Sequence, residues 1–439
     1  MPVARRTFLK RSAAVAVGAG LSGSLPLILK SRPVAPSDTV RIGAIGINGM
    51  GWTNVRSHLK LPSVEIAAIC DVDSSVLERR AKELAEMQDT KATLHTDFRE
   101  LLDTKDIDAV IVATPDHWHS LMAMMACEAG KDVYLEKPLA NSIAECSMIT
   151  QAADHFNRVM QIGQWQRSGP HWDEAMAFVQ SGKLGNVRTA KAWAYQGWMK
   201  NIPVREDAPV PAGVDYDMWL GPAPSRAFNP NRFHFNFRWF WDYAGGLMTD
   251  WGVHLIDMVL YGMEAIAPRA VLSAGGPFAY PEGGMETPDT QQAVFEYDGF
   301  TMLWEHAAGI DNGPYGRNHG VAFIGNQGTL VVDRRGWLVI PEGEKMEAVP
   351  FTPATDNGLD LHTKNFVECI KSREAPACPP ETAWLAAVNA HMGNIAFKTG
   401  RKVYWDHSKQ SFKGDDEANA LIQPHFREPW APPKISQQE

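Results

Sequence analysis

Cysteine is scarce in this chain, and its pattern excludes two kinds of site. The 439 residues include five cysteines, an odd number whose spacings fit neither a disulfide framework nor a metal site. We interpret them as small buried hydrophobic side chains. The histidines also lack the spacing of zinc ligands, so the sequence predicts no metal centre. The five cysteines are Cys70, Cys127, Cys146, Cys369 and Cys378.

Long apolar runs are missing beyond the first 33 residues, and there are no internal repeats. Residues 1–33 form a leader with a basic opening, an apolar middle (Ala13–Leu29) and a short polar close. The Arg5–Lys10 run, with Arg5 and Arg6 side by side, is typical of twin-arginine (Tat) export. We therefore expect recognition by the Tat machinery and a periplasmic or exported location. A leader that is not cleaved would leave the protein tethered to the membrane.

Basic residues are outnumbered by acidic ones. The chain has 42 Lys and Arg against 51 Asp and Glu, and the leader carries six basic residues and no acidic one, so the net charge without it is −15. This balance argues against nucleic acid or an anionic surface as partner. The roughly 400 residues after the leader suggest two domains.

The first residues after the leader have the pattern of a dinucleotide-binding βαβ unit. Val40–Ile45 is typical of a buried strand, and a helix over 51–61 precedes a second strand over 64–69. The turn after the first strand contains three glycines, and Asn48 stands where the usual pattern has another. Such a turn lets the backbone approach a pyrophosphate at the helix N-terminus. Its residues are Gly46, Asn48, Gly49, Met50 and Gly51.

A carboxylate follows the second predicted strand. Asp71 lies 20 residues after Gly51, where it would accept hydrogen bonds from ribose hydroxyls and repel a 2′-phosphate. The sequence therefore predicts NAD rather than NADP. Asp73 is a second candidate for this role, or it caps the helix that begins at Ser74.

Polar and aromatic residues follow each of the next three predicted strands. The carboxyl ends of parallel strands line the ligand crevice, so we expect these residues near the nicotinamide. His117 and His119 could also chelate a metal, although their position beside the cofactor favours substrate binding. The strands span 108–113, 132–135 and 159–162, and the segments that follow them span 114–119, 136–138 and 163–167.

Together these motifs resemble the Gfo/Idh/MocA family, which is named after glucose–fructose oxidoreductase, inositol dehydrogenase and a rhizopine-catabolism protein. The likeness runs from about Val40 to Asp406 and includes nearly all the chain after the leader. Two later segments, 365–373 and 391–395, resemble the exported, twin-arginine members in particular. The motifs that carry the likeness are the glycine turn, Asp71, Thr114–His119, Glu136–Pro138 and Gly245–His254.

In that family a lysine and an Asp-x-x-x-His pair surround the reacting carbon, which implies catalytic roles for Lys137, Asp250 and His254. Asp250 and His254 are four residues apart, so we expect them on one face of a helix. Imidazole suits a general base for alcohol oxidation, and a neighbouring carboxylate can orient the ring. Lys137 can hydrogen-bond the developing alkoxide.

The predicted contacts divide between cofactor and substrate. We expect the cofactor to be bound by Gly46, Asn48, Gly49, Met50, Gly51, Asp71, Thr114, Pro115, His117, Glu136 and Lys137. We expect the substrate to be bound by Trp118, His119, Gln164, Arg167, Trp241 and His254.

The second half alternates strands and turns. The fold class is therefore α/β, with a Rossmann domain over 38–165, an α+β domain with a large open, mostly antiparallel sheet over 166–406, and a C-terminal arm over 407–439. The resemblance implies that one sheet face meets a partner subunit, which predicts a homo-oligomer, either a dimer or a tetramer. The predicted strands are 187–198, 270–273, 291–297, 301–306, 321–324, 328–332 and 336–340, and helices follow at 362–372 and 381–399.

A long insertion, 199–243, is rich in aromatic residues. Aromatic faces stack on the C–H surfaces of sugars, so a saccharide site is one interpretation. The other is a loop that joins the two domains or forms a subunit contact.

Three functions are compatible with the sequence. The first is an NAD-dependent oxidoreductase acting on a secondary alcohol of a sugar, glycoside or cyclitol, which retains its cofactor and regenerates it with a second substrate or an electron carrier. The second is a glycosidase that uses NAD for transient oxidation followed by elimination. The third is a non-catalytic binding protein on the same fold, which the intact Lys137, Asp250 and His254 argue against.

Overall fold

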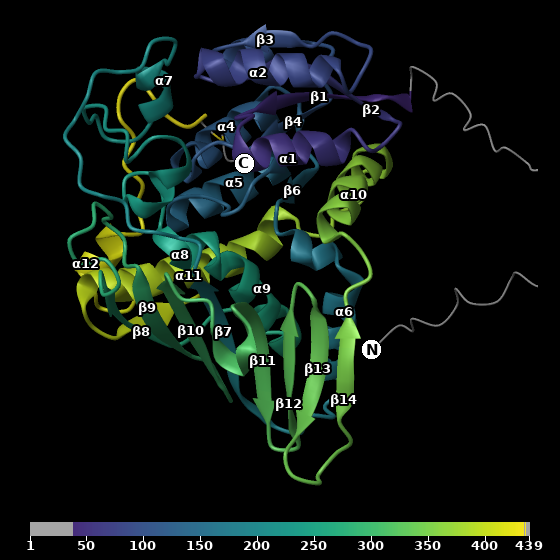
Figure 1. The fold of residues 1–439 in the computed structure, drawn as a ribbon, viewed down its shortest axis with the longest axis vertical. Coiled ribbons are helices and arrows are strands. Elements are labelled where there is room, and N and C mark those ends of the chain that lie inside the picture. Colours follow the sequence, from purple (N-terminus) through teal and green to yellow (C-terminus); the bar gives the residue numbers. More distant parts are fainter. Residues whose placement is uncertain (1–37, 434, 436–439) are drawn as a thin grey trace, which may run out of the picture.

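The computed structural model describes residues 38–433 and 435, and it contains two large sheets (Figure 1). The first sheet has six strands in the order β3-β2-β1-β4-β5-β6, and all its neighbours are parallel. Its buried strands are runs of branched and small apolar residues, as expected of a parallel sheet covered on both faces. The strands are β1 (Val40–Ile45), β2 (Val64–Cys70), β3 (Thr93–His95), β4 (Ala109–Val112), β5 (Asp132–Leu135) and β6 (Met160–Ile162).

Helices connect these strands and confirm the predicted Rossmann domain. The short edge strand β3 was not predicted, because Thr93 and Leu94 are exposed and give no buried pattern. The helices are α1 (Gly49–His58), α2 (Ser74–Ala85), α3 (Phe98–Leu102), α4 (His119–Glu128) and α5 (Ile143–His155), with a 3-10 turn η2 (Asp116–Trp118).

A helix from the second half of the chain completes the first domain. Helix α10 (Gly358–Ser372) lies beside α1 (Figure 1), with Phe366 and Val367 buried in the same core as Trp52. The Ser57 hydroxyl donates to the Asp360 carboxylate over 2.6 Å. The nucleotide-binding half is therefore built from two distant parts of the sequence.

The second sheet has ten strands in the order β14-β13-β12-β11-β7-β10-β9-β8-β15-β16. Every pairing is antiparallel except that of β7 with β10, which are parallel in the middle of the sheet. The predicted mostly antiparallel sheet is confirmed. Its strands are β7 (Val187–Gln196), β8 (Ala270–Gly276), β9 (Thr290–Glu296), β10 (Thr301–Ala308), β11 (His319–Gly325), β12 (Gly328–Asp333), β13 (Gly336–Pro341), β14 (Val349–Pro353), β15 (Val403–Asp406) and β16 (Ser411–Phe412).

Helices cover one face of this sheet and form the main core with it. The opposite face carries a row of apolar side chains, because Leu272, Val294 and Leu303 pair in register across three neighbouring strands. Leu272 is 47% exposed. The remaining helices are α6 (Pro170–Gln180), α7 (Tyr216–Leu220), α8 (Gly246–Asp250), α9 (Gly252–Met263), α11 (Pro380–Thr399) and α12 (Asp416–Ala420), with 3-10 turns η3 (Trp165–Ser168), η4 (His234–Trp239) and η5 (Pro314–Gly316).

The segment predicted as an extended arm, 407–439, is partly regular. It contributes β16 to the sheet and folds into α12, whose N-cap Asp415 accepts from the Ala418 amide. Further on, Trp430 packs against Trp118 of the first domain with 4.8 Å between ring centroids. The arm thus joins both domains.

All five cysteines are buried and free, as predicted. Within residues 38–433 and 435, no helix has the length and apolar character needed to cross a membrane. The predicted leader, 1–33, lies outside the described residues.

Candidate active site

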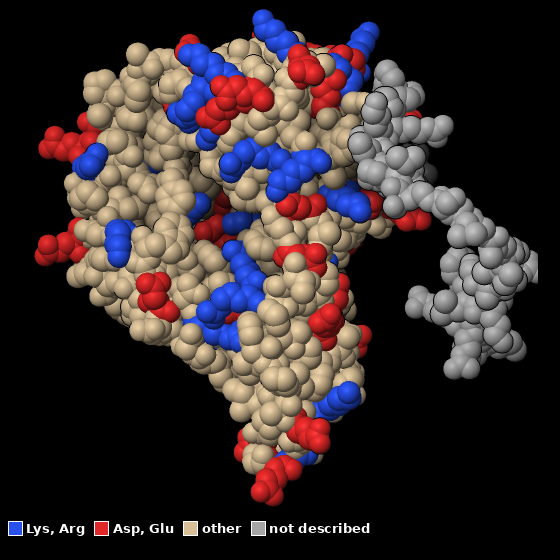
Figure 2. Space-filling model, turned by 45° about the vertical axis from the view of Figure 1, so that its right-hand side comes forward, with Lys and Arg blue, Asp and Glu red and all other residues tan. Residues whose placement is uncertain are grey.

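A cavity of about 740 Å³ lies between the Rossmann sheet and the second domain. Figure 2 shows the hollow from one side, with basic and acidic side chains inside it. Its walls come from the carboxyl ends of the parallel strands, from η4, from α8 and α9, and from the turn between β12 and β13. The carboxyl ends of such strands are where ligands bind in this class of sheet.

The glycine turn has the close packing that a dinucleotide site requires. Gly46 has a φ of +77°, and a Cβ there would lie 2.7 Å from the Ala113 carbonyl oxygen. A Cβ on Gly51 would lie 1.8 Å from the Gly46 carbonyl oxygen. Gly51 does not line the cavity, so its role is to let α1 approach β1, whereas Gly46, Asn48, Gly49 and Met50 do line it.

The N-terminus of α1 is open toward the cavity. Asn48 occupies the N-cap position, but its side chain accepts no hydrogen bond from the helix amides. The Thr114 hydroxyl, also at the cavity, is buried without a partner. Free amides at a helix N-terminus attract phosphate charge, so these residues fit a pyrophosphate.

Asp71 lines the cavity as predicted, and Asp73 does not. The Asp71 carboxylate accepts from the Ile47 and Asp73 amides, each over 3.1 Å. Burial raises the pKa of Asp71 to about 6. Asp73 caps α2 by accepting from the Ser75 amide over 2.9 Å, which is the alternative role weighed for it.

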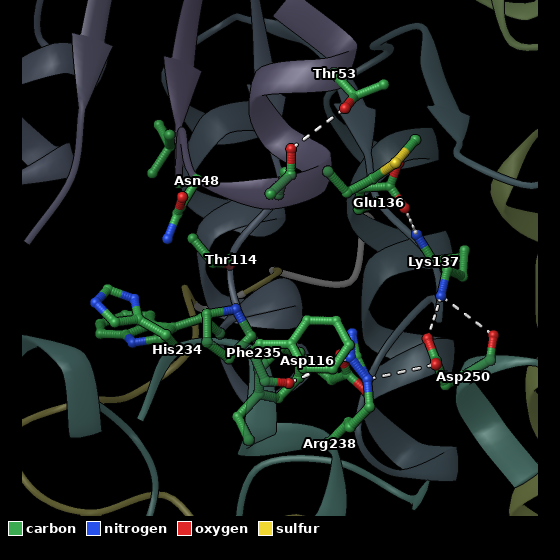
Figure 3. Close-up of a pocket in the computed structure, with 18 of the residues that line it drawn as sticks. Asn48, Thr53, Thr114, Asp116, Glu136, Lys137, His234, Phe235, Arg238 and Asp250 are labelled. Atoms are coloured by element: carbon green, nitrogen blue, oxygen red, sulfur yellow. Dashed lines mark hydrogen bonds and ion pairs between the residues drawn. The ribbon is translucent and has the colours of Figure 1, made fainter. Parts of the chain in front are cut away.

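Lys137 and Asp250 point toward each other at the other end of the cavity (Figure 3). The Lys137 ammonium donates to the Asp250 carboxylate and, over 3.1 Å, to the Asp250 backbone carbonyl. Arg238 Nε lies 3.5 Å from the second carboxylate oxygen. Burial alone would raise the pKa of Asp250, but Arg238 and Lys137 outweigh it and hold the pKa well below its usual range.

The helix predicted to carry Asp250 and His254 on one face is interrupted. Helix α8 ends at Asp250 and α9 begins at Gly252, with Trp251 between them. The His254 amide bonds to the Trp251 carbonyl rather than to Asp250, whose carbonyl Lys137 occupies. Asp250 therefore positions Lys137 and does not hold the His254 ring.

His254 lines the cavity and is buried. Its Nδ1 has no hydrogen-bond partner. Burial, together with the nearby charges of Arg334 and Lys137, lowers the pKa of His254 well below its usual value. The ring is consequently neutral near pH 7 and able to accept a proton, as a general base must.

Two charged residues of the site were not identified from the sequence. Asp116 lines the cavity beside Lys137 and Asp250, and burial raises its pKa well above the usual range. Arg238 reaches the cavity from η4, inside the long insertion. Asp116 belongs to the predicted motif Thr114–His119, and its place after a parallel strand could have identified it as a cavity residue. Nothing in the sequence around Arg238 distinguishes that residue.

The two histidines of that motif do not line the cavity, contrary to our expectation. His117 Nε2 contacts the Trp219 carbonyl over 3.1 Å, and its ring packs among aromatic residues. His119 uses both ring nitrogens on the backbone carbonyls of Pro138 and Thr114. Their neighbours Thr114, Pro115 and Trp118 line the cavity, as do Glu136 and Lys137.

Three further residues predicted to contact substrate lie elsewhere. Gln164 is buried and donates to the Val253 carbonyl over 3.3 Å. Arg167 forms a bidentate pair with the buried Asp257. Trp241 donates to the Glu286 carbonyl. Each sits near a strand end or in an aromatic stretch as supposed, but tertiary packing directs its side chain away from the cavity.

The aromatic insertion, 199–243, joins the two domains, which is one of the roles considered for it, and two of its rings reach the cavity. Most of its rings form a separate core, in which Trp219 packs against Tyr243 with 4.8 Å between centroids. The insertion also contacts the Rossmann domain through His234, whose Nε2 lies 2.9 Å from the Asp73 carboxylate. Phe235 and Phe237 line the cavity beside Arg238.

Both halves of the chain match models of one protein family. Residues 40–164 match the family model for the oxidoreductase NAD-binding Rossmann fold, and residues 186–432 match the model for the C-terminal alpha/beta domain of the same oxidoreductase family. An alpha-N-acetylgalactosaminidase from Shewanella oneidensis is 33% identical over 207 residues, which are 43% of this chain and 45% of that protein. The chain thus spans less than half the length of the curated relatives it matches.

Solved structures share the fold. GenD2 from gentamicin A biosynthesis, in complex with NAD, has a TM-score of 0.64 at 19% identity over 88% of this chain and 100% of its own. Aldose-aldose oxidoreductase from Caulobacter crescentus, complexed with glycerol, has a TM-score of 0.62 at 20% identity over 84% of this chain and 100% of its own. The chain therefore belongs to the Gfo/Idh/MocA oxidoreductase family, with the NAD-binding Rossmann domain of that family followed by its C-terminal alpha/beta domain.

Proposed function

We propose that this protein is an NAD-dependent oxidoreductase that acts on a secondary alcohol of a sugar, glycoside or cyclitol. One observation carries the proposal: a single cavity contains the glycine turn and Asp71 together with Lys137, Asp250 and His254. A phosphate-binding turn and a base that share one cavity are what hydride transfer from an alcohol to a dinucleotide requires.

The residues divide the work of the reaction as follows. NAD, when bound, accepts the hydride from the alcohol carbon. His254, neutral because of burial and two nearby cations, takes the hydroxyl proton. The Lys137 ammonium, held by Asp250, hydrogen-bonds the oxygen as negative charge develops on it. Asn48, Gly49 and Met50 line the cavity where they would hold the pyrophosphate, and Asp71 would accept hydrogen bonds from the ribose.

The first experiment mixes purified full-chain protein, without added cofactor, with a panel of sugars, glycosides and cyclitols. A single-turnover rise in the absorbance of reduced nicotinamide with one class of compound would support the proposal and show that the cofactor is retained. Protein that neither contains NAD nor binds it in a direct titration would refute the proposal.

We also propose export through the Tat pathway with the cofactor already bound. The support is the leader with Arg5 and Arg6 followed by a dinucleotide turn, since folding around a cofactor precedes Tat transport. Fractionation of cells that express the chain should place it in the periplasm or at the membrane. Substitution of both arginines by lysine should retain the protein in the cytoplasm, and unchanged export would contradict this proposal.

A homo-oligomer formed through the second sheet is a further part of the proposal. The support is the uncovered apolar row of Leu272, Val294 and Leu303. Sedimentation should give a dimer or tetramer, and Leu272→Lys combined with Leu303→Lys should give monomers with unchanged NAD affinity. A wild-type monomer at high concentration would disprove the assembly.

A glycosidase that uses NAD catalytically is the second candidate, and the curated alpha-N-acetylgalactosaminidase relative favours it. Transient oxidation beside the leaving group would make a neighbouring C–H acidic and permit elimination of the aglycone. Incubation with aryl glycosides distinguishes the two candidates, because release of the phenol without net formation of NADH indicates the glycosidase.

A further inference from the structure

Arg334 is a cation without an ion-pair partner in the described part of the chain, and it lies at the reaction end of the cavity. It lies in the turn between β12 and β13 and lines the cavity together with His254. Its guanidinium carbon lies 4.4 Å from the ring centroid of Trp165 and 4.6 Å from that of Trp251. The two indoles fix the guanidinium in place but leave its charge unneutralised.

The hydrogen-bonding capacity of Arg334 is unused. Its Nε is buried without a partner, and its guanidinium forms no hydrogen bond or ion pair with any residue in the described part of the chain. The adjacent carboxylate is not available, because Asp333 pairs with Arg317 over 2.9 Å and with Arg335 over 2.7 Å. Burial lowers the pKa of Arg334 to about 10, and the charge of Asp250 offsets this effect only in part.

The other charged side chains at the reaction end of the cavity do not pair with Arg334 either. Lys137 and Arg238 both engage the Asp250 carboxylate, so that carboxylate already has two cations. Burial raises the pKa of Asp116 well above its usual range, which favours its neutral form. Glu136 accepts from the Asn54 amide group and from the Lys137 backbone amide, and it forms no ion pair with Arg334. Arg334 therefore has no ion-pair partner at the reaction end, and a largely buried charge remains unpaired only at a cost unless a ligand compensates it.

We infer that the substrate carries an oxyanion, a carboxylate or a phosphate, which Arg334 binds, and that the enzyme acts on an acidic sugar. The planar guanidinium has donors left to bind such a group in bidentate fashion. The pyrophosphate-binding residues are on β1 and α1, whereas Arg334 contacts Trp165 and Trp251 near His254, so the anion belongs to the substrate and not to the cofactor. The inference rests on the proposed function for the assumption that the ligand is a sugar.

Calorimetric titration of the full chain loaded with NADH, which cannot accept a hydride, tests the inference without turnover. The probes are D-glucuronate, D-glucose 6-phosphate and D-glucose. We expect at least one acidic probe to bind about 10-fold or more tightly than glucose, and Arg334→Met to remove this preference. Which acidic probe binds more tightly identifies the anion as carboxylate or phosphate. Equal affinity for acidic and neutral probes would overturn the inference.

Arg335→Met is the matched control, because this neighbouring arginine is exposed and makes its pair with Asp333 outside the cavity. It should leave all three affinities unchanged. NAD affinity is measured in both variants, and its loss in Arg334→Met alone would assign Arg334 to the cofactor and so contradict the inference. Failure of the proposed oxidoreductase activity is seen separately with the NAD-loaded protein, as acidic probes that bind but produce no reduced nicotinamide.

Discussion

Lys137 donates to both the backbone carbonyl and the carboxylate of Asp250. The Asp250 carbonyl accepts from Lys137 and not from the His254 amide, as it would in a continuous helix. The helix is interrupted at that point, between α8 and α9. The break separates the two residues that the sequence pattern placed on one helix face. It also fixes an ammonium group beside the base without a direct contact between Asp250 and the imidazole.

The first prediction concerns this ammonium. Lys137→Met should reduce kcat/KM by about 100- to 10,000-fold, because the developing alkoxide loses its donor. NAD affinity should change little, since the phosphate-binding turn is intact. Lys183→Met, at an exposed lysine, is the control. Steady-state assays measure kcat/KM in each variant, and unchanged activity in Lys137→Met would show that Lys137 is not the donor to the alkoxide.

Amide substitution of two carboxyl groups in the cavity should change kcat/KM to very different extents. Burial raises the pKa of Asp116 and so favours its neutral acid form, for which an amide is a close substitute, and Asp116→Asn should alter kcat/KM by less than about 3-fold. Asp250 is ionised between Arg238 and Lys137, so Asp250→Asn should reduce kcat/KM by about 100-fold or more. Steady-state assays of both variants at pH 7 measure these changes. Equal losses of kcat/KM would contradict the assignment of charge.

The pH profile of kcat reports on His254. Burial, Arg334 and Lys137 lower its pKa, so the neutral base persists to acid pH. Removing one cation in Arg334→Met should raise the pKa of His254, and the acid limb of the profile should move to higher pH. Arg334→Lys retains the charge and should leave the limb in place. An acid limb that does not move in Arg334→Met would show that another group controls it.

Asp71 links the cofactor site to stability. Burial raises its folded-state pKa to about 6, above the value of about 3.9 in an unfolded chain. The stability that protonated Asp71 contributes is complete below about pH 4 and is lost as the pH rises through about 6. Relative to Asp71→Asn, the NAD-free wild type should therefore lose about 2 kcal/mol of unfolding free energy between about pH 4 and pH 7. Urea unfolding at both pH values tests this, and a constant difference would refute it.

The glycine turn gives the fifth prediction. A Cβ on Gly51 would lie 1.8 Å from the Gly46 carbonyl oxygen, so Gly51→Ala must push α1 away from β1. We expect a loss of about 1–3 kcal/mol of stability and a fall of about 10-fold or more in NAD affinity. Gly130→Ala is the control for backbone strain alone, because Gly130 lies outside the cavity and has a φ of +77° but no atom within 4 Å of the added Cβ. Equal effects of the two variants would mean that close packing is unimportant here.

Periodicity and turn chemistry were sufficient to predict the two sheets. Val40–Ile45 and Asp132–Leu135 are buried apolar runs bounded by polar turns, and both are strands with the predicted limits. The glycine turn and Asp71 could be placed for the same reason, because their spacing follows from one local βαβ unit. Strands β3, β14, β15 and β16 were not predicted, because they are short and lie at or next to the edges of the two sheets, where the sequence gives no clear periodic signal.

Side-chain direction could not be predicted from sequence. His119 lies at a strand end, as supposed, but two backbone carbonyls bind its ring. Arg167 was expected at the crevice and instead pairs with Asp257, a partner 90 residues away. Arg334 gave no signal, because its environment arises where Trp165, Trp251 and a sheet turn meet, and these come from three distant parts of the chain.

The packing of Trp430 on Trp118 has a consequence for the order of events in biosynthesis. Trp118 and Phe98 form part of the cavity wall, and Trp430 contacts both of them from behind. Residues more than 300 positions apart must therefore meet before this wall is complete. While the Rossmann segment is still attached to the ribosome, the rings of Trp118 and Phe98 would be exposed to solvent. The dinucleotide can therefore bind in the completed cavity only after Trp430 has been translated.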